Sequence, residues 1–263
     1  MTGIAIRTLD ALWVLWTCAR MQVKAMKGNE LGLVIGVVQP VVLILVTVGA
    51  HTDEAPEVLT GWTVGVLLTT LWASTVWIAG GILRGELRSG TLARSVTSLR
   101  PGFLVLLGKC LGATARALLV ISCSVAVTLL MSRAPVTADR PGWMLLGLLA
   151  SVCSGAALGM LLACILLLTR YGLQVSAALM YPVFILGGLL VPPDLLPGFL
   201  HWLPSLISLR WAREFLTNAA AGTVSWQALI WLVALTTVYF LLAVKAFARV
   251  IDHARREGTL ELV

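Results

Sequence analysis

Acidic side chains are scarce in this chain, and none lies within its long apolar stretches. Only 12 of the 263 residues are Asp or Glu, and charged residues of both signs make up 12% of the sequence. A soluble domain of this size carries about twice that fraction of charge. Hydrophobic residues reach 59%, which is typical of a polytopic membrane protein and excludes an ordinary water-soluble enzyme.

The motifs of catalytic and metal sites are also missing. The three histidines lie far apart, and the chain has no HExxH, no GxSxG and no paired carboxylates. No CxxC or other metal spacing joins the five cysteines, so we interpret them as small apolar packing residues. No patch outside the membrane combines basic and aromatic residues, which argues against a nucleic-acid partner. We expect this chain to hold no catalytic residue, no metal and no cofactor.

Six apolar runs are long enough to cross the hydrocarbon core of a bilayer, which takes about 20 residues of helix. Isolated strands of this length would leave backbone groups unpaired in lipid, and barrel strands would be shorter and would alternate. The sequence predicts an all-α membrane protein with one domain over residues 1–263. We expect the six spans at residues 31–50, 62–83, 103–131, 143–169, 172–191 and 226–248.

The basic residues predict the orientation of these spans. If both termini are cytoplasmic, fifteen of the 19 lysines and arginines face the cytoplasm and four face outward. An excess of Lys and Arg in cytoplasmic loops is the usual determinant of topology. We therefore expect a multi-pass protein with both termini in the cytoplasm.

An amphipathic segment within residues 1–28 precedes the first span. Trp16 lies on its apolar face and Arg7 and Lys24 on its polar face, with Arg20 adding to the basic flank. Such a helix lies in the membrane interface and contacts lipid. Two interpretations stay open: a lever that touches a cytoplasmic partner, or an anchor that only orients the first span.

Polar and small residues are arranged in rows on two of the spans. Thr70, Ser74 and Trp77 fall on one stripe of the second span, and Tyr181 lies before a proline in the fifth. The stripe can pack against another helix or, with Tyr181, line a translocation path; both interpretations stay open. In the fourth span a small residue recurs at every fourth position from Gly147, which predicts a helix–helix contact.

Residues 192–222, predicted to be extracellular, are strongly apolar and interrupted by prolines. The pieces are too short to span, so we expect short re-entrant helices before the last span. Leu196, Pro197, Phe199 and Trp202 are the candidate residues of an outer gate. The alternative is a structural cap over the bundle.

The loop between the second and third spans, Leu83–Pro101, concentrates charge and helix signals. Its Glu86 to Leu92 stretch, followed by Ser98 and Pro101, resembles the E-x-x-x-G-T-L…S-P signature of type-2 ABC exporter permeases. The P…GG…P…LP…P order of residues 182–204 is similar to the pattern before the last span of that family. The chain departs from the signature where Leu99 and Arg100 separate the Ser-Pro pair.

The resemblance implies a bacterial plasma-membrane permease domain without its own ATPase. Two such subunits, identical or related, would form the pore with two separate ABC ATPase subunits that hold ATP and Mg. The coupling loop would comprise Arg84, Glu86, Arg88, Gly90, Thr91 and Arg94. Glu86 would lie at a helix start and Gly90-Thr91 would break and recap the backbone, while the arginines pair with acidic groups of the ATPase. Alternatively, the arginines only enforce topology, which does not explain Glu86 or the Gly-Thr pair.

The apolar spans also bear on the energy source. Ion-coupled transporters usually carry Asp or Glu at depth, and these spans have none, so an external ATPase would have to supply the energy. The function expected is export of an amphipathic small molecule, drug or antibiotic, peptide or lipid-linked substrate. The alternative is a membrane scaffold that does not transport. An intramembrane enzyme is disfavoured because the chain offers no nucleophile–base pair.

Overall fold

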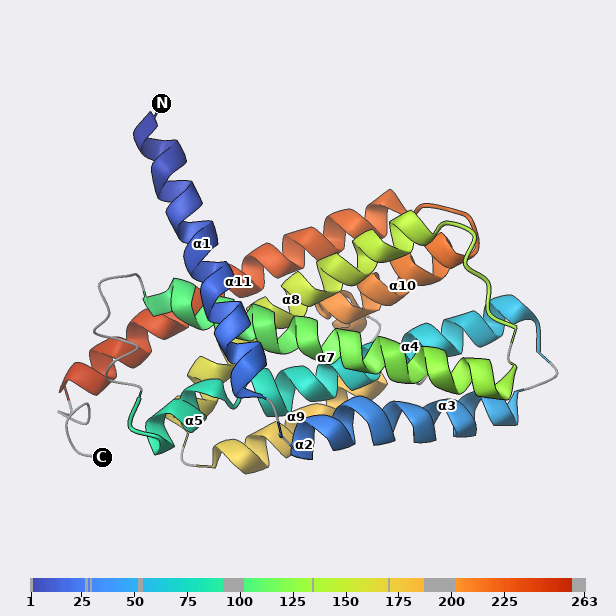
Figure 1. Cartoon of the computed structure of the whole chain (residues 1–263), viewed down its shortest axis with the longest axis horizontal. Coiled ribbons are helices and arrows are strands. Elements are labelled where there is room, and N and C mark those ends of the chain that lie inside the picture. The colour runs from blue at the N-terminus through green and yellow to red at the C-terminus, as the bar shows by residue number, and fades with distance from the viewer. Residues whose placement is uncertain are drawn as a thin grey trace.

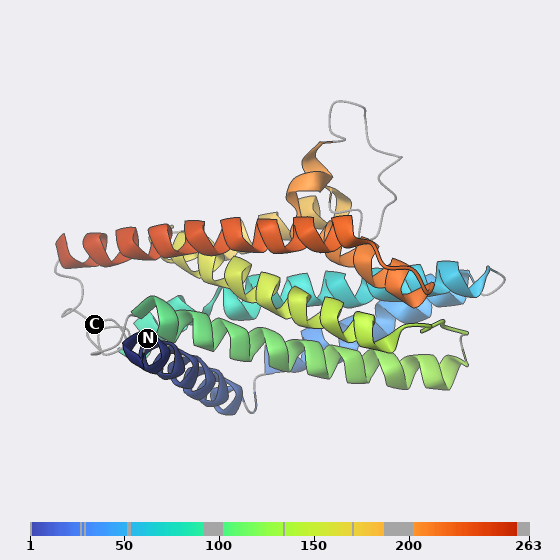
Figure 2. The same ribbon diagram turned by 90° about the horizontal axis from the view of Figure 1, so that it is seen from above.

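The computed structural model describes residues 2–26, 28, 30–51, 54–91, 102–133, 135–169, 171–186 and 202–256, and every regular element in these ranges is helical. Long helices lie side by side in an elongated bundle, and α1 crosses one end of it (Figures 1 and 2). The elements are α1 (Thr2–Ala25), α2 (Glu30–Leu33), η1 (Val34–Val38), α3 (Gln39–Ala50), α4 (Pro56–Ser74), η2 (Thr75–Ala79), α5 (Ile82–Arg88), α7 (Gly102–Ser132), α8 (Pro141–Leu168), α9 (Gly172–Leu186), η5 (Leu203–Leu206), α10 (Ser208–Ala220) and α11 (Trp226–Arg256).

Five helices in the described ranges are long and apolar enough to cross a membrane. They cover Glu30–Ala50, Pro56–Arg88, Gly102–Ser132, Pro141–Leu168 and Trp226–Asp252. Each corresponds to one expected span, and the second runs through η2 into α5 and ends at Arg88 rather than at the expected residue 83. The sixth expected span, 172–191, is described only as the 15-residue α9, and residues 187–191 lie outside the described part of the chain.

Two of these helices contain π-helical turns. In η1 the amide of Gln39 donates to the carbonyl of Val34, five residues back, directly before Pro40. Proline removes an amide and crowds the preceding turn, which explains a distortion of the helix at this position. The second π-helical segment, η2, joins α4 to α5, and there the amide of Gly80 donates to the carbonyl of Thr75 at 2.8 Å.

The helices α4 and α8 form the centre of the bundle. In the most apolar 18-residue stretch of each long helix, 78% of the residues are buried for Pro56–Arg88, which contains α4, and 67% for α8, against 17% for α11. The small residues of α8 allow this close packing: a Cβ at Gly147 would clash with Phe215 of α10, and one at Gly159 would lie 2.6 Å from Cβ of Ala79. The helix–helix contact predicted from the small-residue repeat is therefore confirmed.

The bundle has two ends with different contents. At one, called the α5 end, lie α5, the end of α1, the end of α8, the start of α9 and the last turns of α11 (Figure 1). At the other, called the α10 end, the amide of Asp139 donates to the carbonyl of Ala220 and the hydroxyls of Thr60 and Thr137 lie 3.2 Å apart. These bonds join the α7–α8 link to α10 and to the start of α4.

The 13-residue α10 is too short to span and packs its apolar side into the bundle. Phe215 is fully buried on this side, and Trp211 donates its indole N–H to the carbonyl of Ser205. Short helices before the last long helix agree with the expectation, whereas their re-entry into a membrane stays a prediction. Of the four candidate gate residues, Trp202 is exposed, and Leu196, Pro197 and Phe199 lie outside the described residues.

Candidate functional site

The Gly-Thr pair of the charged loop forms the C-terminal cap of α5. Gly90 has a φ of +67°, the left-handed region that glycine adopts without strain. The amide of Gly90 donates to the carbonyl of Leu87 at 3.2 Å, and that of Thr91 to the carbonyl of Glu86 at 3.0 Å. These two bonds define a Schellman motif, which satisfies carbonyls at the end of the helix.

Glu86 therefore lies in the last turn of α5, and its expected place at a helix start is wrong. The sequence interpretation placed a helix start at Glu86 and a break and recapping of the backbone at Gly90-Thr91, whereas the chain reaches α5 directly from α4 and η2 and α5 begins at Ile82. At this position the carboxylate of Glu86 pairs with the ammonium of Lys109 on α7. The exposed fractions of the two side chains are 11% and 21%, so the pair is partly shielded from solvent.

Arg84 connects α5 to the link between α8 and α9. Its Nη2 donates to the carbonyl of Leu166 at 3.2 Å, one of the last carbonyls of α8. The same guanidinium occupies the space next to Gly172, the first residue of α9, where any Cβ would clash with it. The contacts of Arg84 therefore lie within the subunit.

The outward surface of α5 consists of Gly85, Arg88 and the capping residues Ser89, Gly90 and Thr91, which are all exposed. The hydroxyls of Ser89 and Thr91 lie 2.9 Å apart and bond within the cap. Ile82 and Leu83 are buried and hold the opposite side of α5 against the bundle. The structure thus leaves Arg88 as the exposed arginine of α5, and Arg94 lies outside the described residues.

The amphipathic N-terminal segment is the helix α1, which crosses α7 with direct backbone contact. A Cβ at Gly112 would lie 2.3 Å from the carbonyl oxygen of Ala19, and one at Gly108 would lie 2.8 Å from Cβ of Cys18. Burial at this crossing raises the pKa of the Cys18 thiol, while nearby Lys109 opposes the shift. The ammonium that holds α5 thus lies close to α1.

The other face of α1 is open. Trp16 has an exposed fraction of 69%, and Arg20 and Lys24 are exposed as well. The backbone of Arg7 belongs to α1, but its side chain lies outside the described part of the chain. An exposed face with both tryptophan and basic residues is suited to a membrane interface, and whether α1 works as a lever or an anchor stays open.

The predicted polar stripe of the second span is divided by the structure. Thr70 is fully buried and donates to the carbonyl of Val66, so it serves packing within α4. Trp77 lines a cavity of about 520 Å³ at the α5 end, and Ser74 lines a cavity of about 20 Å³ beside it. The side chain of Tyr181, the fourth candidate lining residue, is outside the described part.

Sequence reasoning missed two basic residues of α7. Lys109 is the partner of Glu86, and Arg116 lines the 20 Å³ cavity. For Lys109 the usable signal was its charge opposite to that of Glu86, on the other side of the loop between the second and third spans. For Arg116 the signal was the position of an arginine at the middle of an apolar run.

In the described ranges no three His, Cys, Asp or Glu residues come together as a metal site would require. A family model described as ABC-2 type transporter matches residues 14–220, which includes α5, its cap and both basic residues of α7. No curated protein sequence matches the chain.

Proposed function

Because the chain belongs to the ABC-2 type transporter family, we propose that it is the permease subunit of an ATP-driven exporter. In this proposal two permease subunits, identical or related, form the pore in a bacterial plasma membrane. Two separate ABC ATPase subunits bind ATP and Mg at the cytoplasmic side, where we place the α5 end and both termini. The cargo class is an amphipathic small molecule, drug or antibiotic, peptide or lipid-linked compound.

The exposed surface of α5 and its cap is the contact we assign to the ATPase. This assignment is carried by one observation: α5 is tied to other helices on its inner side and presents an arginine on its outer side. Glu86 connects it to α7, and Arg84 connects it to α8 and α9. A displacement of α5 by the ATPase would therefore move these helices with it.

The roles of the loop residues follow from their contacts. Arg88 supplies the exposed charge that can bond to a carboxylate of the ATPase. Gly90 and Thr91 fix the shape of the surface by ending the helix, and Arg84 and Glu86 transmit force inside the subunit. In the five long helices the carboxylates lie only near the helix ends, at Glu30, Glu57, Glu86 and Asp252. The absence of Asp and Glu from their middle parts agrees with a transporter that draws its energy from ATP hydrolysis on another chain.

The test is reversal of the exposed charge. We expect Arg88→Glu to weaken association with the partner ATPase at least tenfold and to abolish ATP-dependent export, with normal folding of the permease. Arg140→Glu is the matched control, because Arg140 is also exposed but lies at the α10 end. Association is measured by co-purification and titration in nanodiscs. Equal association of the Arg88 and Arg140 variants would refute the assignment of α5 as the coupling surface.

A further inference from the structure

An arginine of α7 has a buried nitrogen without a partner. Among the described residues, the buried Nη1 of Arg116 has no hydrogen-bond partner, and no carboxylate forms an ion pair with this side chain. Buried donors are nearly always satisfied in native proteins, and an unpaired buried charge is strongly disfavoured. The position therefore requires an explanation, and a bound anion is the simplest one.

Arg116 lies where two π-helical segments meet α7. Its cavity of about 20 Å³ is lined by Gly36 of η1, Ile78 of η2 and Ser74 directly before η2. Gly36 permits a close approach, since a Cβ there would lie 2.9 Å from Cγ1 of Val120 on α7. Single π-helical turns occur frequently at functional sites. Here two π-helical segments lie on neighbouring helices and face the same arginine, which indicates a functional site at this position.

The small cavity shares lining residues with two larger spaces. Met26 and Ile78 belong both to its lining and to that of the 520 Å³ cavity at the α5 end. Val120 is shared with a groove of about 710 Å³ between α3 and α7. The three spaces thus neighbour one another through shared lining residues, and Arg116 lines the smallest of them.

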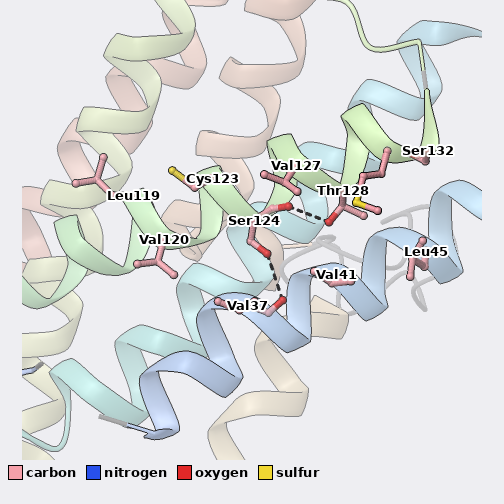
Figure 3. Close-up of a pocket in the computed structure, with 11 residues that line it drawn as sticks. Val37, Val41, Leu45, Leu119, Val120, Cys123, Ser124, Val127, Thr128 and Ser132 are labelled. Carbon is pink, nitrogen blue, oxygen red and sulfur yellow. Dashed lines mark hydrogen bonds between the residues drawn. The ribbon is translucent and has the colours of Figure 1, made fainter. Parts of the chain in front are cut away.

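The groove between α3 and α7 has an apolar wall (Figure 3). Val37 and Val41 on one side and Val127 on the other are typical of its lining. The hydroxyls in the wall bond to backbone carbonyls: Ser124 donates to Val37 at 3.2 Å and Thr128 to Ser124 at 2.8 Å. Because these groups are already occupied, the wall is suited to a chain without polar atoms.

We propose that Arg116 binds the anionic head group of the transported compound, while its alkyl or acyl tail lies in the groove between α3 and α7. The proposal rests on the transport function proposed above and specifies its cargo as an anionic amphiphile. The guanidinium supplies the complementary charge and the groove supplies the apolar surface. From Leu119 to Ser132 the groove follows α7 for about 20 Å, a large part of a hydrocarbon core about 30 Å thick.

The conformation described here is closed at the arginine. A cavity of about 20 Å³ has room for about one water molecule, so a head group enters only when η1 and α3 separate from α7. Closure at the middle with wider spaces on both sides is the arrangement that alternating access requires of one of its states.

Because the exposed thiol of Cys123 lies in the wall of the groove, a ligand that occupies the groove should slow alkylation of this thiol. Protection from alkylation therefore measures occupation of the groove. The permease, with its other four cysteines replaced by alanine, is placed in phosphatidylcholine nanodiscs, and the alkylation rate of Cys123 is followed. We expect dodecyl phosphate to protect it at a concentration at least tenfold lower than dodecyltrimethylammonium or dodecyl maltoside. Arg116→Gln should remove this preference, Arg116→Lys should keep most of it, and Arg140→Gln should leave it unchanged.

Several results would overturn the proposal. One is equal protection by the three head groups, and another is an unchanged preference in Arg116→Gln. A thiol that does not react even without ligand would mean that a second copy of the chain covers the groove. A resident phospholipid is the remaining occupant: if phosphatidylglycerol protects Cys123 but ATP with the partner ATPase does not change that protection, the anion is not cargo.

This assay does not depend on the ATPase contact. Arg88→Glu should abolish export yet leave protection by dodecyl phosphate unchanged. If protection fails while the complex still exports another cargo, the head-group assignment is wrong and the proposed function stands. If protection succeeds while no ATPase associates, the proposed function is wrong instead.

Discussion

The ion pair between Glu86 and Lys109 should couple α5 energetically to α7, and a double-mutant cycle measures this coupling. Glu86→Gln and Lys109→Met each remove one charge at similar side-chain size. Exposed fractions of 11% and 21% place the pair between a surface pair and a fully buried one. Surface pairs contribute about 0–1 kcal/mol, and breaking a buried pair costs about 3–5 kcal/mol. We therefore expect each single substitution to cost about 2 kcal/mol.

Thermal unfolding in detergent provides the measurement. Cys110 and Cys164 are fully buried in the packed helices, so their reaction with a thiol-sensitive dye reports unfolding. Cys18, Cys123 and Cys153 are replaced by alanine to remove the background. A loss of about 2 kcal/mol corresponds to a fall in Tm of about 4–8 °C for a chain of this size.

The combined variant decides whether the two charges interact. Once one charge is gone, removal of the other should cost little, so the double variant should be more stable than additivity predicts by about 1–2 kcal/mol. The exchange Glu86→Lys with Lys109→Glu should recover part of the lost stability. Effects that add to within about 0.5 kcal/mol would show that the pair does not couple α5 to α7.

Three further predictions concern the cap and the crossing of α1 with α7. Gly90→Ala should lower stability by about 1 kcal/mol because of its positive φ, whereas Gly85→Ala, which meets no atom within 4 Å, should be neutral or stabilising in the same melting assay. Gly112→Leu should push α1 off α7 and speed tryptic cleavage in α1 several-fold, and unchanged cleavage would contradict the crossing. Because burial raises its pKa, Cys18 should be alkylated slowly at neutral pH and faster as pH rises past 9, and Gly112→Leu should remove this delay.

Hydropathy was sufficient to predict most of the fold, because long apolar runs in lipid have few alternatives to helix. The expected span at 103–131 became Gly102–Ser132, and the one at 143–169 became Pro141–Leu168. Turns that depend on the neighbouring helix were not predictable. The π-helical turn of η2 has no proline inside it and follows from packing that a single sequence does not display.

The candidate site was only partly predictable. The signature around Gly90 correctly indicated the family, and positive φ at a helix end explains why glycine stands there. The partners of Arg84 and Glu86 depend on the direction in which α5 leaves the bundle, which no local pattern encodes. Periodicity places a side chain on a face of its own helix but does not state which neighbour that face meets.

The backbone contact between α1 and α7 has a consequence for biogenesis. The ribosome releases α1 first, but its binding surface at Gly108 and Gly112 does not exist until about ninety more residues have been made and the third long helix has been inserted. During that interval the nascent helix has to wait on a lipid surface or on an insertion factor. Assembly of the α5 end of this permease is thus timed by the insertion of α7.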